Sequence, residues 1–99
     1  MIEVRFYDRI GLGDRNFFYF DARIPCVLPP GSEVILPKAH FTIRRYMYVG
    51  VEDPSDLSIL LARVKFRFPQ GVPLIEDAQA RHLLSEGIQQ GDYADAFSV

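Results

Sequence analysis

Two stretches decide the fold, FTIRRYMYVGV at residues 41–51 and LSILLARVKFRF at residues 57–68. Both are rich in β-branched and aromatic residues, which favour the pleated surface of a strand over a helix. The intervening segment EDPSD at residues 52–56 combines proline with short polar side chains, a composition typical of a turn. The two stretches therefore predict the arms of an antiparallel hairpin.

The alternation of apolar and charged residues predicts how the arms pair. If Arg44 faces Lys65, one face of the hairpin carries apolar pairs such as Ile43 with Phe66, and basic and tyrosine side chains occupy the other face. A slip of one residue would mix the two kinds on both faces, so burial favours this register. Arg45 is the exception, because it falls on the apolar face. It requires a carboxylate partner, a side chain that extends to solvent, or a β-bulge.

The N-terminal part of the chain predicts further strands. Residues 2–7 and 17–24 each alternate between apolar and polar side chains, as half-buried strands do, and the Gly-Leu-Gly-Asp segment at residues 11–14 predicts a turn between them. A Pro-Gly turn at residues 30–31 precedes a short third strand at residues 33–36. An N-terminal hairpin is therefore expected to pack with the one formed by residues 41–68.

The C-terminal third changes period. Residues 74–88 carry an apolar stripe with helical spacing, formed by Ala80, Leu83, Leu84 and Ile88. Residues 89–99 show no sustained period, so this tail is expected to be loose or ordered only against a partner.

Together these patterns predict a mainly β (α+β) fold. We expect one small domain over residues 1–99, with a β body at 1–68, a helix at 74–88 and a tail at 89–99. The β body is expected to be a strongly curved antiparallel sheet of about five strands, either open or closed into a barrel of the SH3-like or OB-like kind, because so short a chain must cover its apolar face.

Composition narrows the classes of function. The net charge of -2 excludes a broadly basic nucleic-acid binder. The charge is unevenly distributed, because residues 1–68 contain ten Lys and Arg against eight Asp and Glu, whereas residues 69–99 contain one Arg against five Asp and Glu. This acidic third could fold over the basic stripe of the body. Because Cys26 is the single cysteine, an internal disulfide is excluded and a cytoplasmic setting is favoured. We expect the Cys26 thiol to be packed and inert. No apolar run approaches the roughly 20 residues of a membrane span.

Catalytic and metal motifs are not recognisable in the sequence. His40 and His82 lack partners at metal-ligand spacing, and no serine lies between glycines in a strand–turn–helix elbow. Gly11-Leu12-Gly13 lacks the Lys-Ser/Thr of a phosphate-binding loop. We therefore expect a protein that is not an enzyme and has no catalytic residues, no metal and no cofactor.

One constellation suggests a binding surface. The outer face of the hairpin at residues 41–68 is predicted to carry Arg44, Tyr46, Tyr48, Arg63, Lys65 and Arg67. Arginine and tyrosine are frequent anchors of protein interfaces, and basic residues interleaved with tyrosines also suit phosphate contacts with base stacking. The favoured hypothesis is a protein–protein interaction module, of the kind found among small accessory or inhibitory proteins of phages and plasmids, with self-association left open. The alternatives are a small nucleic-acid binder using the same face, a solvated face with no partner, and an enzyme.

Overall fold

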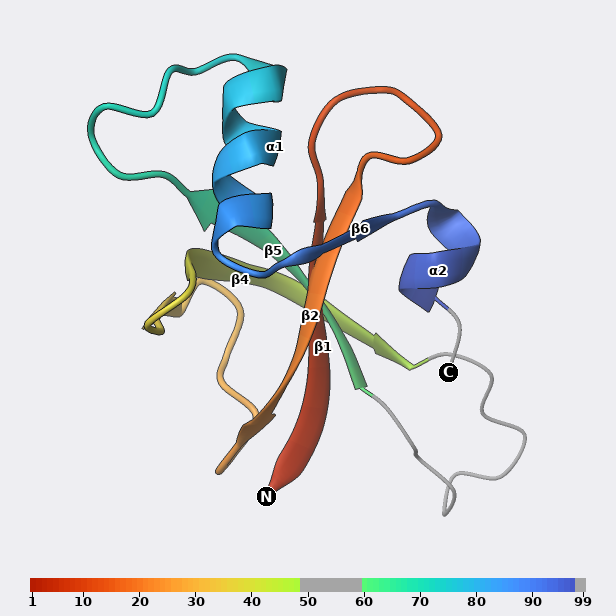
Figure 1. Cartoon of the computed structure of the whole chain (residues 1–99). Helices are drawn as coiled ribbons and strands as arrows, with labels where there is room; N and C mark the ends of the chain where they lie inside the picture. The colour runs from red at the N-terminus through yellow and green to blue at the C-terminus, as the bar shows by residue number, and fades with distance from the viewer. Residues whose placement is uncertain (49–59, 98–99) are drawn as a thin grey trace.

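Strands β1 (Ile2–Arg9) and β2 (Phe17–Ile24) form the expected N-terminal antiparallel hairpin in the computed structural model, which describes residues 1–48 and 60–97 (Figure 1). Val4 and Phe6 of β1 and Phe18 and Phe20 of β2 are buried on one face, as the alternation predicted. The turn expected at residues 52–56 lies outside the described residues.

The remaining strands are β3 (Glu33–Ile35), β4 (His40–Tyr48), β5 (Leu60–Arg67) and β6 (Gln89–Gly91). Together with the hairpin they form one six-stranded sheet in the order β3-β4-β5-β1-β2-β6. The pairing of β1 with β5 is parallel and the other pairings are antiparallel, so the sheet is mixed and not antiparallel throughout. It has one strand more than the about five that were expected, and the mainly β fold is confirmed. The described sheet is open, with β3 and β6 at its edges, and closure into a barrel is not confirmed.

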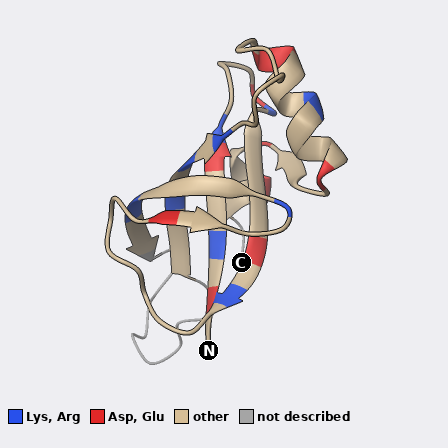
Figure 2. Ribbon diagram, turned by 90° about the vertical axis from the view of Figure 1, so that its left-hand side faces the viewer, with Lys and Arg blue, Asp and Glu red and all other residues tan. Residues whose placement is uncertain are grey.

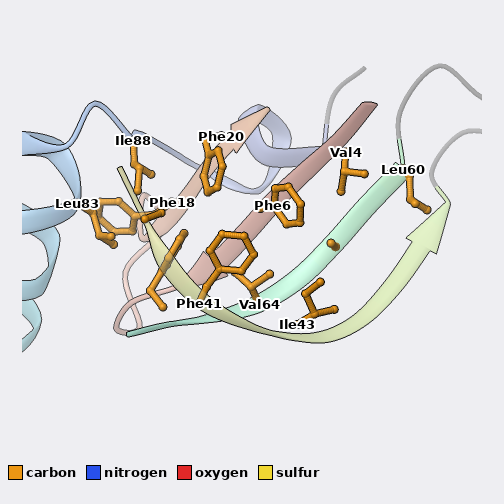
Figure 3. Close-up of a cluster of buried hydrophobic side chains, with 13 residues drawn as sticks. Val4, Phe6, Phe18, Phe20, Phe41, Ile43, Leu60, Val64, Leu83 and Ile88 are labelled. Carbon is orange, nitrogen blue, oxygen red and sulfur yellow. The ribbon is translucent and has the colours of Figure 1, made fainter. Parts of the chain in front are cut away.

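Strong curvature lets this small sheet bury its own apolar face. Phe41 of β4 and Phe20 of β2 are three strand positions apart, about 14 Å in a flat sheet. Their ring centroids nevertheless lie 5.7 Å apart, and the rings of Phe41 and Phe6 lie 4.8 Å apart. Figure 3 shows these rings pointing toward one another inside the bent sheet. The sheet therefore folds over a phenylalanine core.

Helix α1 (Glu76–Ser85) closes one end of this core through Leu83 and is shorter than the predicted 74–88. The backbone of Gly87 has a φ of +84°, a left-handed conformation that glycine adopts without strain. Its N–H bonds to the carbonyl of Leu84, and the N–H of Ile88 bonds to that of Leu83, which is the Schellman pattern that ends a helix. Gly87 therefore terminates α1 and returns Ile88 to the core.

The described part of the tail, residues 89–97, forms a strand and a helix, contrary to the expectation of a loose tail. Strand β6 pairs with β2, and helix α2 (Tyr93–Phe97) follows it. Asp92 and Asp95 each accept a hydrogen bond from the backbone N–H of the other, a reciprocal cap that starts α2 and lowers the pKa of Asp92. The helix covers a second apolar cluster on the other face of the sheet, formed by Tyr7, Tyr19, Leu61 and Ala96.

Two further expectations concern the chain's surroundings. Neither α1 nor α2, the helices of the described residues, is long and apolar enough to span a membrane. Cys26 is exposed, so the expectation of a packed thiol is wrong. It lies just beyond the end of β2, where the chain leaves the sheet.

Candidate binding site

A β-bulge at Arg44 determines which side chains of β4 face solvent. Ile43 pairs with Val64, but the next pair is Arg45 with Arg63, so Arg44 is the extra residue. The bulge shifts the alternation and places Arg45 on the same face as Arg63. A bulge was one of the three ways in which the sequence analysis expected Arg45 to be accommodated, and it keeps the Arg45 side chain out of the apolar core.

The predicted register is wrong on both sides of this bulge. Before the bulge, Ile43 pairs with Val64 and not with Phe66, a difference of two residues that leaves the faces unchanged. Thr42, not Arg44, pairs with Lys65, and Tyr46 pairs with Ala62 on the apolar face. Tyr46 packs against the phenylalanine core, where burial raises the pKa of its hydroxyl. Its predicted place on the outer face is therefore wrong, because one inserted residue reverses the side to which each later residue points.

The other predicted site residues have different outcomes. Arg63, Lys65 and Arg67 alternate along β5 on one face, and all three are exposed. Arg44 is exposed at the bulge and borders the same surface. The backbone of Tyr48 pairs with Leu60, and its side chain lies outside the described residues.

These four basic residues line a cleft with a volume of about 640 Å³, hereafter the basic cleft. Arg9 of β1 is its fifth cation, which the sequence analysis did not single out. The parallel register of β1 and β5 runs only from the pair Val4 and Leu60 to the pair Tyr7 and Arg63. Beyond that point both strands continue without pairing to each other, and the cleft lies between them. Figure 2 shows blue Lys and Arg segments on the strands of the sheet.

Asp8 lies in the basic cleft and joins the two diverging strands. Its carboxylate accepts hydrogen bonds from the backbone N–H of Phe66 at 3.2 Å and of Arg9 at 2.8 Å. Burial raises the pKa of Asp8, and these hydrogen bonds and the charges of Arg63 and Lys65 act in the opposite direction. One carboxylate thus fixes the backbone of the cleft and offsets part of its positive charge.

Gly11 and Glu76 bring the start of α1 against the cleft. The φ of Gly11 is +87°, and the Glu76 carboxylate approaches so closely that a β-carbon at Gly11 would overlap it. Glu76 is the second acid among the described residues that line the cleft, and the acidic C-terminal third also contributes Leu74 and Gln79 to this lining. The acidic third therefore borders the cleft without covering it.

No salt bridge between described residues neutralises the charge of the basic cleft. Within residues 1–48 and 60–97, salt bridges join Arg5 to Asp21, Arg15 to Asp95, Arg23 to Glu3, and His40 to Glu33. None of these pairs involves a cation of the cleft. Among the described residues that line the cleft, five cations therefore face two carboxylates, and this lining carries a net positive charge.

The pH dependence of stability tests whether the carboxyl group of Asp8 is buried in the basic cleft. Because its pKa is raised in the folded state, the native protein binds this proton more tightly than the unfolded chain does. Its contribution to stability therefore increases as pH falls through the raised pKa and is complete below the ordinary value of 3.8. Asp8→Asn keeps a carbonyl acceptor but removes this titration.

We expect the stability of the wild type relative to Asp8→Asn to increase between about pH 7 and about pH 4. Urea denaturation midpoints of both proteins across this range measure the difference, and other titrating groups cancel in it. A difference that stays constant or decreases as the pH falls would show that burial does not dominate at Asp8.

Comparisons with known proteins assign no family to this chain. No family model, no curated protein and no solved structure matches it. The function must therefore be argued from the chemistry of the basic cleft and its surroundings.

Proposed function

We propose that the protein is a non-catalytic interaction module that binds an acidic segment of a partner protein in the basic cleft. The observation that carries the proposal is the gathering of five cations, without salt bridges among the described residues, around one concave surface: Arg9, Arg44, Arg63, Lys65 and Arg67. Carboxylates of a partner would pair with these side chains, and arginine can bind a carboxylate through two parallel hydrogen bonds.

A polypeptide fits the basic cleft better than a nucleic acid does. Of the two tyrosines expected to stack on bases, Tyr46 packs against the core. The phenylalanines that line the cleft are engaged as well, because Phe66 is buried and Phe68 packs on the ring of His82. The cleft also contains the carboxylates of Asp8 and Glu76. A phosphodiester backbone has no hydrogen-bond donor to offer them, whereas a peptide has its N–H groups.

The histidines give no support to the enzyme alternative. His40 and His82 line one pocket of about 250 Å³ together with Glu86. The described residues lining that pocket include no serine, threonine, tyrosine or cysteine that a histidine could activate as a nucleophile.

The cytoplasmic setting and self-association remain predictions from composition and from the open sheet edges.

Binding of a defined acidic probe tests the proposal. The probe is a fluorescein-labelled peptide of alternating Glu and Ser, followed by fluorescence anisotropy at low and at physiological salt. We expect saturable binding that weakens with salt, and at least a roughly tenfold weaker affinity in the triple variant Arg63→Ser, Lys65→Ser, Arg67→Ser.

The matched control removes the same charge elsewhere, by the triple variant Arg15→Ser, Arg23→Ser, Arg81→Ser. Its affinity for the peptide is expected to stay within about twofold of the wild type at physiological salt, because none of these three residues lines the cleft and salt screens exposed charges. Equal loss in both triple variants, or no binding of the peptide at low salt, would refute the proposal. Tighter binding of a single-stranded oligonucleotide that is lost in the first triple variant would replace it with the nucleic-acid alternative.

A further inference from the structure

A second pocket, of about 290 Å³, adjoins the basic cleft, and Arg9 and Arg63 line both. It lies on the face of the sheet covered by α2. Its remaining lining is mostly aromatic, hereafter the aromatic pocket: Tyr7, Phe17, Tyr93 and Phe97, with Met47 and Arg45. Two concave surfaces of different chemistry are thus continuous through two shared arginines.

The walls of the aromatic pocket are rings held at defined angles. The ring of Phe97 contacts Tyr7 edge-on at 4.9 Å and Phe17 edge-on at 5.7 Å between centroids. Tyr93 stacks on Phe97 at 4.4 Å and is itself 66% exposed. Three of the rings therefore form an ordered wall, and the fourth presents an open aromatic surface at the rim.

The polar part of the aromatic pocket is cationic. The guanidinium of Arg9 lies 5.5 Å from the centroid of the Phe17 ring, and no acidic residue is among the described residues that line the pocket. Arg45 and Arg63 line the pocket together with Tyr7, and their charges act against the burial that raises the pKa of the Tyr7 hydroxyl. That hydroxyl donates to the sulfur of Met47 at 3.7 Å.

Rings, a thioether and guanidinium groups are the surroundings that an aromatic side chain prefers. Such a ring stacks edge-on against other rings, contacts sulfur favourably and attracts cations over its face. Because positive charge in the pocket lacks a lining acid, the occupant is expected to come from an anionic molecule. The basic cleft next to this pocket also favours an anionic partner.

We propose that the partner segment carries an aromatic residue beside its carboxylates, with the ring in the aromatic pocket and the acids in the basic cleft. This inference rests on the proposed function and specifies its partner. Arg63, Lys65 and Arg67 project from one face of β5 at intervals of about 7 Å, the two-residue repeat of extended chain. An extended partner matches this repeat when its acids are two residues apart and its aromatic residue is two residues from the first acid.

Four peptides test the inference. The first has the sequence Phe-Gly-Glu-Ser-Glu-Ser-Glu, the second has this sequence reversed, the third has Ser in place of Phe, and the fourth has Gln in place of every Glu. We expect one of the two Phe peptides to bind the wild type about tenfold more tightly than the Ser peptide, because a buried aromatic anchor commonly dominates an interface. The Gln peptide is expected to bind much more weakly than this Phe peptide and the Ser peptide.

Two variants assign the gain to the aromatic pocket. Tyr93→Ala and Arg45→Ala change residues that line this pocket and not the basic cleft. Each is expected to reduce the gain from Phe by at least threefold while the affinity for the Ser peptide stays within about twofold. Lys65→Ser, which changes the basic cleft alone, is expected to weaken the Phe and Ser peptides equally.

The outcomes separate this inference from the proposed function. Equal binding of the Phe and Ser peptides would overturn the inference and leave the proposed function standing. A gain from Phe that survives both Tyr93→Ala and Arg45→Ala would overturn it as well. Failure of all three Glu-containing peptides to bind at low salt would refute the proposed function, and the inference with it.

Discussion

Replacing Phe41 with alanine is expected to destabilise the protein by about 3–5 kcal/mol. The side chain is completely buried, and its ring packs against the rings of Phe6, Phe20 and Phe66 at centroid distances of 4.8, 5.7 and 6.2 Å. It is the contact through which β4 bends back over β2. Small domains have a total stability of about 5–15 kcal/mol, so this variant is expected to be partly unfolded at 37 °C.

Urea denaturation followed by circular dichroism measures the effect. The matched control is Leu84→Ala on the partly exposed side of α1, where 46% of the leucine is exposed and the expected loss is below about 1 kcal/mol. A loss below about 1 kcal/mol for Phe41→Ala would contradict the curvature of the sheet, because a flat sheet would not bring this ring into the core.

Replacing Arg5 with methionine is expected to cost about 1.5–3 kcal/mol and to release α2 from the sheet. The guanidinium donates two hydrogen bonds to the carboxylate of Asp21, at 2.7 and 3.1 Å. It also donates to the backbone carbonyls of Asp95 and Ala96 at 3.3 and 3.2 Å, in the last turn of α2, and lies over the ring of Tyr19. A cation is favourable at this end of a helix. The side chain of Arg5 is only 13% exposed, so its contacts are poorly screened by water.

Hydrogen exchange of the Ala96 and Phe97 amides reports on this docking, and denaturation midpoints report on stability. The matched control is Arg23→Met, which breaks a pair with Glu3 at the surface of the same hairpin and is expected to cost at most about 1 kcal/mol. If Arg5→Met left the exchange of α2 as slow as in the wild type, the helix would be held by its apolar contacts alone.

The sequence predicted those parts of the fold that local patterns encode. Strict alternation in β1 and β2 identified the face that packs into the phenylalanine core, and the helical period located α1. The alternation did not reveal the burial of Tyr7 and Tyr19 on the opposite face, under α2. The parallel pairing of β1 with β5 could not be predicted, because it joins segments more than fifty residues apart and leaves no local periodicity. Helix α1 ends at Ser85, before the predicted end at residue 88, because the C-terminal cap at Gly87 stops it, and the apolar stripe does not encode this cap.

The C-terminal tail was missed for a different reason. Strand β6 consists of Gln89, Gln90 and Gly91, which have no apolar alternation, and it exists because its backbone pairs with β2. Helix α2 did leave a signal in the sequence. Asp92 and Asp95 have the spacing of a reciprocal cap, and Tyr93 and Phe97 lie four residues apart, as on one face of a helix.

The candidate site was predicted in part. The alternation along β5 correctly placed Arg63, Lys65 and Arg67 on one face. Tyr46 was misplaced because the bulge at Arg44 reverses the alternation of β4, and alternation alone does not locate a bulge. Arg9 was missed because its proximity to β5 depends on the non-local parallel pairing.

Nuclear magnetic resonance mapping of the bound acidic peptide tests the central claim most directly. Titrating the alternating Glu and Ser peptide into ¹⁵N-labelled protein is expected to shift the backbone amides around the basic cleft, at residues 8–11, 44 and 63–68. The side-chain Nε–H signals of the cleft arginines are expected to move with them. Shifts confined to the edge strand β3 or to the exposed side of α1, with residues 63–68 unchanged, would show that acidic chains do not bind in the basic cleft.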